Sequence, residues 1–520
     1  MSKRNSPAQT FGEHVSGMRA EYRMSKTGRF KPTLTGVALT GSGFSYHLTQ
    51  AAYLKMIELA RQYDRENMVV GQGINRVCEN VIQSGFTLDP MTGDTGVDDL
   101  LRARWQRWCA DPQLCDSAGR DDWQRKEFLT LRHILVDGDV FHLALDDGRL
   151  QSIEAHRVQT PASTRGENIH LGVEYDTTRR PQRYFVVKGE PSASRASAAT
   201  LKADPIDARD AEGRQQVFHC FHPERISQTR GVTCMARICD AVGMHDDIQF
   251  ATLVRQQVAA CLALITERPD SNSAFTTSAL GEQTTEISDS GSTRTLEGMA
   301  PGIMIDGLPG EKLSAFVANI PGTEFFPHVM LVLTIISINL GIPAAVLLLD
   351  PSNTNFSGWR GAIDQARVGF RRIQEWLIKS LHRPVYSWQL ARWIEEDPEV
   401  AAAAERLGAD ISLHRWNPPS WDYIEPYKDA SADAIKLDNW LSSPRRLHAR
   451  RGQDWSDIAG EIVQDRLLLF RQALDAARVL NQEFPEAAID WREMIGVQTK
   501  PAPAQDVDAS QPTDQGVNQQ

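Results

Sequence analysis

A helical pattern of unusual length, broken once by a polar insert, dominates the middle of the chain at residues 232–396. Its first arm, residues 232–267, places apolar residues mostly three and four positions apart, which is the helix period, and contains no proline. At about 1.5 Å per residue this arm would extend roughly 54 Å. A helix of that length is typical of a coiled coil, a membrane span or an assembly, and not of an ordinary compact domain.

The polar insert covers residues 270–322 and is rich in Ser, Thr and Gly. It holds seven acidic residues against two basic ones. We expect two short strands in it, at 302–308 and 313–317, on either side of the turn Leu308-Pro309-Gly310.

The helical pattern resumes over residues 323–340 and ends at Gly341, a residue type that commonly terminates helices. A polar hinge, residues 350–355, leads into the third arm, where apolar residues from Trp359 onward form one continuous stripe. We expect Pro384 to kink or end this arm, because proline lacks the N–H group that the helix ladder needs.

Composition restricts the function. The chain has 520 residues and a net charge of −11, so generic nucleic-acid binding is disfavoured. A protein that encloses DNA and lets it slide is not disfavoured, since each phosphate contact adds binding free energy that opposes motion. Residues 1–10 are polar and predict no signal peptide, and the densest apolar run, 329–338, is too short to span a bilayer. Seven cysteines without a CxxC pair indicate reduced thiols in a cytosolic setting.

The N-terminal part predicts an α+β domain. Residues 1–50 are basic and lack apolar periodicity, so they form a mobile arm or an arm that packs on a neighbouring subunit or an acidic scaffold. Residues 51–81 are helical, with an interruption at Gly71-Gln72-Gly73. In the helix at 100–109, Trp105 and Trp108 are expected core anchors. A further helix is expected at 123–135.

Period-two patterns predict the strands of this domain and one loop. The expected strands are Val140–Leu145, Leu150–Val158, Ile169–Tyr175, Gln182–Val187 and Val217–Phe221, and Gly189–Gly213 is an expected surface loop. Beyond the third arm, helices are expected at 398–408, 430–441 and 454–480, an irregular segment at 416–427, and a disordered tail at 499–520.

Searches for catalytic chemistry return little. The segment from Gly307 to Leu313 does not fit a phosphate loop, because its spacing is wrong and Leu313 replaces the magnesium-binding hydroxyl. On a strand, Cys220 and His222 would face one side and His219 the other, which favours a strand end over a metal site. Adjacent acidic pairs such as Asp146-Asp147 point in different directions and are read as solvated turns. We therefore expect no catalytic residue, no metal and no cofactor.

Several separate runs of this sequence together resemble the lambda-type family of phage portal proteins. The likeness covers roughly residues 50–480, and its runs are Ala60-Arg61 to Gly71, Val136-Asp137-Gly138-Asp139-Val140-Phe141, Ile153-Glu154-Ala155-His156-Arg157-Val158, Gly172-Val173-Glu174-Tyr175-Asp176, His222-Pro223-Glu224-Arg225, Gln228-Thr229-Arg230-Gly231-Val232, Leu340-Gly341-Ile342-Pro343, Asn355-Phe356-Ser357-Gly358-Trp359-Arg360, Ile424-Glu425-Pro426-Tyr427-Lys428 and Arg451-Gly452-Gln453-Asp454. Each run is weak by itself, but their order and spacing are fairly specific.

The resemblance implies an α+β, mainly helical portal fold assembled as a ring. Its parts would be a flexible N-terminal arm (1–50), an α+β wing (51–227), a first stem helix (228–269), a small clip that contains strands (270–322), a second stem helix (323–343), a tunnel loop and long helix (344–396), C-terminal wing or crown helices (397–495) and a disordered tail (496–520).

The function that the resemblance implies is a non-enzymatic DNA channel. Twelve identical subunits would surround the DNA at one vertex of a tailed-phage head, during packaging and ejection. The implied partners are double-stranded DNA, the terminase large subunit, a head-completion or adaptor protein, and the major capsid and scaffold proteins. No membrane is involved. The protein would reside in the virion, and in the host cytoplasm during assembly, where it would nucleate procapsid formation.

Three sets of site residues follow from this resemblance. The expected DNA-facing tunnel loop consists of Ser352, Asn353, Thr354 and Asn355, and the basic face of the tunnel helix of Arg360, Arg367 and Arg371. Helical spacing of Arg367 from Asp364 also permits an ordinary ion-pair face. The expected residues for terminase docking are Glu282, Glu286, Asp289, Asp306, Glu311 and Lys312.

Two other classes of function stay open at this stage. An enzyme of the packaging machinery, such as a terminase-like motor or nuclease, would need a phosphate loop and a convergent set of carboxylates. A host-membrane pore would need a longer apolar run than this sequence contains.

Overall fold

The computed structural model describes residues 44, 48–161, 168–188, 203–266, 283–287, 293–297, 303–306, 325–352, 354–421, 425–451, 453, 455–486 and 489–494. The chain divides into two compact units, one ending at Pro419 and the other beginning at Ser420. Its described residues are mainly helical with some strands, as the sequence predicted.

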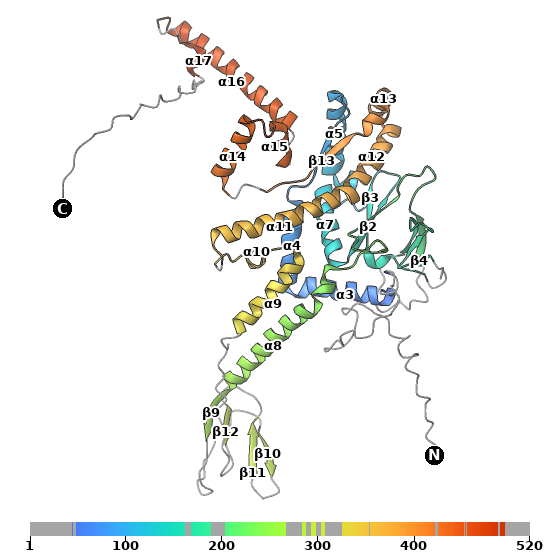
Figure 1. Ribbon diagram of the computed structural model, residues 1–520, viewed down its shortest axis with the longest axis vertical. Helices are drawn as coiled ribbons and strands as arrows, with labels where there is room; N and C mark the ends of the chain where they lie inside the picture. The colour runs from blue at the N-terminus through green and yellow to red at the C-terminus, as the bar shows by residue number, and fades with distance from the viewer. Residues whose placement is uncertain are drawn as a thin grey trace, which may run out of the picture. The chain divides into compact units, whose positions relative to one another are not determined.

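Helices make up most of the first unit (Figure 1). They are α3 (Gln50–Glu66), α4 (Met68–Ile82), α5 (Thr95–Ala110), α6 (Pro112–Cys115), α7 (Trp123–Val136), α8 (Cys239–Cys261), α9 (Phe325–Leu340), α10 (Ala344–Leu348), α11 (Phe356–Leu377), α12 (Arg383–Glu396) and α13 (Pro398–Leu407), with 3₁₀ turns η2 (Ala155–Arg157), η3 (Cys234–Arg237) and η5 (Gly408–Ser412) and a π-helical segment η4 (Ile378–His382).

The strands of this unit form small sheets. They are β1 (Thr87–Pro90), β2 (Asp139–Ala144), β3 (Leu150–Glu154), β4 (Ile169–His170), β5 (Val173–Tyr175), β6 (Pro181–Val187), β7 (Ala203–Asp207), β8 (Val217–Phe221), β9 (Leu262–Thr266), β10 (Gln283–Ile287), β11 (Thr293–Glu297), β12 (Ile303–Asp306) and β13 (His414–Asn417). Two antiparallel sheets, β3-β2-β8 and β4-β5-β6-β7, form the α/β part, and the remaining strands pair as β1-β13, β10-β11 and β9-β12.

The two larger sheets share one hydrophobic core. In the register of the first sheet, Phe141 of β2 lies opposite Ile153 of β3 and His219 of β8. Phe141 and Ile153 pack with Tyr184 and Val186 of β6 in the second sheet. Helix α7 lies beside β2, as Figure 1 shows, and Trp105 and Trp108 of α5 are buried as the sequence predicted. The α/β part is therefore a packed body that can support the longer helices.

The first predicted helix, residues 51–81, breaks at a different residue from the one expected. The chain leaves the helix at Asn67, whose backbone is extended and whose side chain accepts a hydrogen bond from the N–H of Val70 at 3.0 Å. Gly71 and Gly73 instead lie inside α4. A Cβ atom at Gly73 would lie 2.4 Å from Cδ1 of Leu340, so this glycine permits α9 to approach closely.

The first long arm is shorter than the predicted helix 232–267. It begins with η3, where the Thr233 hydroxyl accepts from the N–H of Met235, and α8 covers only Cys239–Cys261. Residues Leu262–Thr266 form β9, which pairs in parallel with β12. The periodicity of a short apolar run does not distinguish a helix from a strand. In this segment, pairing with the distant strand β12 makes it a strand. The strand expected at 302–308 is confirmed over β12, whereas 313–317 lies outside the described residues.

The third arm does not end at Pro384. Helix α11 continues through the π-helical segment η4 into α12, and Pro384 occupies the first turn of α12. A π turn shifts the backbone hydrogen bonds by one residue, so the proline ring no longer meets a carbonyl of a regular α-helical ladder. The expected helix end at Pro384 is therefore wrong, because it assumed a regular helix before the proline, and the alternative of a kink there stays a prediction.

Other differences concern short elements. Strand β7 lies within the segment 189–213 that was expected to be a loop, and β13 includes Trp416–Asn417, which were expected to be irregular. The expected strand Ile169–Tyr175 splits into β4 and β5 at Leu171 and Gly172, both of which have positive φ angles. The predicted helix at 398–408 and the strand Val217–Phe221 are confirmed as α13 and β8.

The second unit is helical over its described residues and consists of α14 (Pro426–Asp438), α15 (Pro444–Arg450), α16 (Trp455–Glu483) and α17 (Trp491–Met494). Helix α14 has no buried residue, and α16 exposes Leu467, Leu468 and Leu469 about half. In the parts of the chain that the structure describes, no helix combines the length and the apolar character that crossing a bilayer requires.

Candidate functional site

A fully buried arginine, Arg230, lies where the chain leaves the α/β part and leads to α8. Its Nε and Nη2 atoms donate to the two carboxylate oxygens of Asp139, at the start of β2. Its other hydrogen bonds go to the Tyr53 hydroxyl and to the backbone carbonyls of Val158, Leu171 and Ala155. A buried guanidinium is tolerated only when its donors are satisfied, and this one is.

Asp139 collects further donors around the same charge. The Tyr53 hydroxyl of α3 donates to its Oδ1 at 2.9 Å, and Nε2 of His219 on β8 lies 3.0 Å from Oδ2. Burial disfavours ionisation of Asp139, but the charge of Arg230 and the hydrogen bond from His219 outweigh it and hold the pKa of Asp139 well below its ordinary value. Burial also lowers the pKa of His219, although Asp139 opposes that shift. The pair is therefore ionised and tied to three elements.

Two glycines bring the backbones together beside this ion pair. A Cβ atom on Gly231 would lie 1.8 Å from the carbonyl oxygen of Gly138, and a Cβ on Gly138 would lie 2.6 Å from the carbonyl carbon of Gly231. Gly138 also has a φ angle of 103°, which other residues rarely adopt. The N–H of Gly231 donates to Oδ2 of Asp139 at 3.2 Å. Both positions therefore require glycine.

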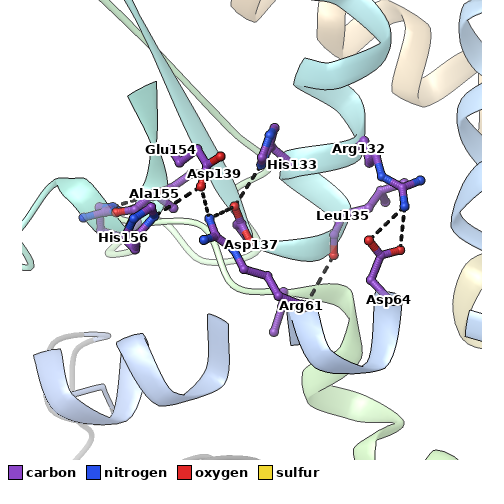
Figure 2. A network of polar contacts seen from close by, with 12 residues as sticks. Arg61, Asp64, Arg132, His133, Leu135, Asp137, Asp139, Glu154, Ala155 and His156 are labelled. Carbon is purple, nitrogen blue, oxygen red and sulfur yellow. Dashed lines mark hydrogen bonds and ion pairs between the residues drawn. The ribbon is translucent and has the colours of Figure 1, made fainter. Parts of the chain in front are cut away.

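A second layer of ion pairs surrounds this junction on the side of α3 (Figure 2). Arg61 of α3 donates to both carboxylate oxygens of Asp137 at 2.8 and 2.7 Å, and to Glu154 of β3 at 2.7 Å. Arg132 of α7 reaches both oxygens of Asp64 at 2.8 Å. These contacts join α3 to α7, β2 and β3, so the base from which α8 departs is fixed on several sides.

The two other long arms are rooted in the same unit. The side chain of Asn339 on α9 donates to the carbonyl of Cys234 in η3 at 3.0 Å, which ties the bases of α9 and α8 together. Gln374 of α11 is 1% exposed and donates to the carbonyls of Val81 at 2.9 Å and Pro419 at 3.0 Å. Each of the three arms is therefore tied by hydrogen bonds at its base within the first unit.

The outer faces of these arms expose many large apolar side chains. On α8 these are Met244, Phe250, Leu253 and Val254, and on α9 they are Phe326, Leu331, Ile335 and Ile338. Phe250 is 69% and Ile338 is 72% exposed. Contiguous apolar surface of this kind marks a contact with another protein surface.

Comparisons with known proteins identify the family. Residues 45–374, more than half of the chain, match the family described as phage portal protein, lambda family. The chain belongs to this portal family. A probable portal protein of Halomonas phage phiHAP-1 is 22% identical over 413 residues, which cover 77% of this chain and 75% of that protein.

Solved structures with some likeness also come from phage-like particles. They include the virion of a native gene transfer agent particle, with a TM-score of 0.40 and 13% identity, and the neck of the native particle computed with C12 symmetry, with a TM-score of 0.39 and 13% identity. Both matches cover 76% of this chain and 93% of the other.

The expected tunnel loop of this portal protein leads directly into α11. The N–H of Ser352 donates to the carboxylate of Asp350 at 2.9 Å, and the Thr354 hydroxyl donates to the carbonyl of Pro351 at 3.1 Å. Asn355 caps α11 through the N–H of Gly358 at 2.7 Å. The loop is thus short, exposed and held by its own polar groups, while Asn353 lies outside the described residues.

The other predicted residues fall on separate elements. Arg360, Arg367 and Arg371 lie on α11, where Arg367 pairs with Asp364 at 3.7 Å, and none of these arginines is without a partner. Of the expected docking residues, Glu286 lies on β10 and Asp306 on β12. The remaining four, which the structure does not describe, are Glu282, Asp289, Glu311 and Lys312.

The described residues contain no group of three or more His, Cys, Asp or Glu side chains that could hold a metal ion. His219, which the sequence placed at a strand end, serves the Asp139 pair instead, and its ring stacks on Phe141 with centroids 4.2 Å apart. The junction itself escaped sequence reasoning. The sequence feature that could have indicated it is the pair of runs Asp137-Gly138-Asp139 and Arg230-Gly231, in each of which a charged residue is next to a glycine.

A second buried polar pair lies beside the π-helical segment. Nδ1 of His382 in η4 is 3.4 Å from Oε1 of Glu127 on α7, and both side chains are at most 1% exposed. Aromatic rings surround His382, including Phe86 at 4.3 Å and Trp416 at 4.9 Å between centroids. Burial raises the pKa of Glu127 well above its ordinary value and lowers the pKa of His382 to about 3, so the site favours the neutral form of each group.

Breaking the central ion pair is expected to cost far more than breaking an exposed one. Asp139→Asn or Arg230→Met should each lower the free energy of unfolding by about 3–5 kcal/mol, because the partner charge remains buried and uncompensated. Arg183→Met, at the exposed pair with Glu174, is the matched control and should cost about 1 kcal/mol or less. Denaturant unfolding of the purified variants measures the difference, and similar losses for Arg230→Met and Arg183→Met would contradict the assignment.

Glu127→Gln should change how stability depends on pH. The raised pKa means that Glu127 holds its proton more tightly in the folded state, so its contribution is complete below about pH 4.5 and declines as pH rises. Glutamine does not titrate, so the melting temperature of Glu127→Gln minus that of the native chain should increase steadily from pH 5 to pH 8. The titration of His382 occurs in both proteins and largely cancels. Glu58→Gln, at an exposed position, serves as the control; a flat difference for Glu127→Gln would refute the buried neutral acid.

Proposed function

We propose that this portal protein forms a closed ring of identical subunits at one vertex of a phage-like capsid and that DNA passes through its centre. The single observation that carries the proposal is the set of exposed apolar side chains on α8 and α9. Family membership supports it, because portal proteins are in general structural rather than enzymatic. We infer the same for this chain.

The exposed faces favour a ring over an open assembly. Phe250 and Leu253 are exposed on α8, and Leu331 and Ile338 on the neighbouring α9, so in our proposal the α8 face of one subunit would contact the α9 face of the next. Contact between unlike surfaces is a head-to-tail interface, which produces a ring when the rotation closes. A ring of twelve is the number that membership of the family suggests.

The helices and strands support an assignment of the parts. The α/β body within residues 51–227 acts as the wing, with the Arg230–Asp139 junction at its exit. Residues 228–269 and 323–343 supply the stem through α8 and α9. The strands β10, β11 and β12 within residues 270–322 form the clip between them, and β9, at the end of the first stem segment, pairs with β12. Residues 344–396 supply the tunnel loop and long helix, and 397–495 the crown.

The tunnel loop is the proposed DNA-facing constriction. Ser352, Asn353, Thr354 and Asn355 are polar and carry no charge, so they offer hydrogen bonds without the strong phosphate attraction that would resist sliding. The arginines of α11 provide a weaker field behind the loop, reduced by acids such as Asp364.

The proposed partners follow from the same assignment. The clip would dock the terminase large subunit during packaging and a head-completion or adaptor protein afterwards. The wing and crown would contact the major capsid and scaffold proteins, in the host cytoplasm during procapsid assembly and in the finished virion. Acidic residues on the clip strands, such as Glu286 and Asp306, would contribute to docking.

Electron microscopy and mass photometry of the purified chain test the ring. The native chain should form hollow rings, whereas Leu253→Glu combined with Ile338→Glu should remain folded and monomeric. Both side chains are more than half exposed, so the substitutions cost the isolated chain little. A charge buried at a subunit interface is strongly unfavourable.

Gln106→Glu, on an exposed position of α5 in the α/β part, adds the same kind of charge and should leave rings intact. A native chain that stays monomeric at micromolar concentration would overturn the proposal. Rings that survive the paired substitution would show that α8 and α9 are not the contact surface.

The clip assignment has its own test. Replacing residues 280–312 by a short Gly-Ser linker should leave ring formation unchanged, because the stem and wing lie outside the deletion. Binding to the terminase large subunit of the same phage, measured by co-sedimentation, should disappear. Unchanged terminase binding would refute docking at the clip, and loss of rings would make the clip an assembly element.

A further inference from the structure

The C-terminal unit contains one strongly basic segment, residues 444–451, which we call the basic turn. Its sequence, Pro-Arg-Arg-Leu-His-Ala-Arg-Arg, has four arginines and no acidic residue, whereas the chain as a whole has a net charge of −11. The segment lies within the proposed crown, residues 397–495. Such a local reversal of charge is typical of a surface that meets a polyanion.

The turn before this segment is held by backbone hydrogen bonds. Helix α14 ends with N–H groups of Trp440 and Leu441 donating to the carbonyls of Leu437 and Lys436, at 3.1 and 2.8 Å. Trp440 has a φ angle of 59°, in the left-handed region where glycine is usual. It is nevertheless a tryptophan and is 92% exposed. A bulky side chain at an unfavourable backbone position, with no packing within the unit to compensate, indicates a role on the surface.

The basic turn is then fixed with Arg445 and Arg446 exposed. The Ser443 hydroxyl accepts from the N–H of Arg446 at 3.2 Å, which begins α15. Leu447 is buried, and the ring of His448 stacks on Trp455 of α16 with centroids 5.2 Å apart. These two contacts hold one side of the helix against α16.

Arg445 and Arg446 lie on the exposed part of the same turn. Among the residues that the structure describes, neither is paired with an acidic side chain. Adjacent guanidinium groups repel one another, so their arrangement is unfavourable until counter-charges arrive. The planar guanidinium matches the oxygens of a phosphate, with which it forms paired hydrogen bonds.

We propose that the basic turn binds the phosphate backbone of double-stranded DNA, with Arg445 and Arg446 as the phosphate contacts and the exposed ring of Trp440 beside them. DNA is favoured over an acidic peptide because each planar guanidinium matches the oxygens of a phosphate, and the indole N–H of the exposed Trp440 is a further donor for a phosphate oxygen. The biological setting rests on the proposed portal function, since that is what brings DNA to this chain. The contact itself depends only on the second unit.

Fluorescence anisotropy with a labelled 40-base-pair duplex tests the proposal on the full-length chain. Arg445→Gln combined with Arg446→Gln should weaken binding by about tenfold at 100 mM salt and reduce the slope of log K against log salt by about 1.8, since each phosphate contact contributes about 0.9. Arg466→Gln combined with Arg471→Gln removes the same charge from exposed positions on α16 and should leave both values unchanged.

Trp440→Gly separates contact from folding. Glycine suits the left-handed backbone at this position, so the variant should melt at or above the native temperature while its DNA affinity falls. The proposal would be overturned if both double variants lost DNA affinity equally. It would also be overturned if Arg445→Gln with Arg446→Gln kept the native affinity and the native salt slope. Selective loss of binding to a poly-glutamate peptide, with DNA binding intact, would assign the turn to an acidic protein. Ring formation is measured separately by microscopy. Failure of the DNA contact would therefore leave the portal proposal intact, and failure to form rings would leave the DNA contact intact.

Discussion

The rest of the first unit depends on one buried ion pair, Arg230 with Asp139. Taking a guanidinium and a carboxylate out of water is costly, and the mutual attraction offsets that cost only when every remaining donor and acceptor is satisfied. Here both carboxylate oxygens are used, and three backbone carbonyls, those of Val158, Leu171 and Ala155, accept the remaining N–H groups. An arrangement with so many simultaneous requirements contributes less to the net free energy of folding than to the uniqueness of the folded structure. Few alternative conformations of the chain could satisfy all of these groups at once.

Uniqueness at this point matters because of where Arg230 stands in the chain. It immediately precedes Gly231, whose backbone contacts Gly138, and the next elements are η3 and α8. The direction of a long helix is set at its base, and a small error there grows with distance. Asn339 then ties α9 to the carbonyl of Cys234, so the second long helix takes its direction from the same base. The apolar faces that the described residues leave exposed on α8 and α9 can therefore be presented in a defined orientation.

Sequence reasoning located the long helices because periodicity is repeated many times along them, and repetition makes a weak signal strong. It failed where a single distant contact decides the local structure. Leu262–Thr266 continues an apolar helix pattern, yet it pairs with β12, some 40 residues away. Pro384 predicts a helix end, yet the π turn before it accommodates the ring. Gly73 predicts an interruption, yet it accommodates Leu340.

The central ion pair could not be predicted from the sequence for the same reason: a contact between distant parts of the chain decides it. Periodicity reports which face of an element is buried, but it does not name the partner, and Arg230 and Asp139 are 91 positions apart. What the sequence did show was the pair of runs, Asp137-Gly138-Asp139 and Thr229-Arg230-Gly231, on which the resemblance to the portal family partly rested. The structure brings these two runs into direct contact, so the glycines and the charges are needed together. Of the predicted site residues, Ser352, Thr354 and Asn355 are exposed, but exposure alone does not identify what a loop faces.

Charge along the chain separates two demands that a DNA channel makes. A constriction through which a duplex must move benefits from groups that hydrogen-bond weakly and exchange quickly, and the uncharged side chains of the proposed tunnel loop, residues 352–355, would meet that need. A surface that holds DNA in place benefits from guanidinium groups, and Arg445 and Arg446, which have no acidic partner among the described residues, would meet that opposite need. Because each neutralised phosphate adds binding free energy, the two tasks cannot share one surface. A net charge of −11 does not exclude either task, because the tunnel loop needs no charge and the basic turn needs only a local excess of arginine over acidic residues.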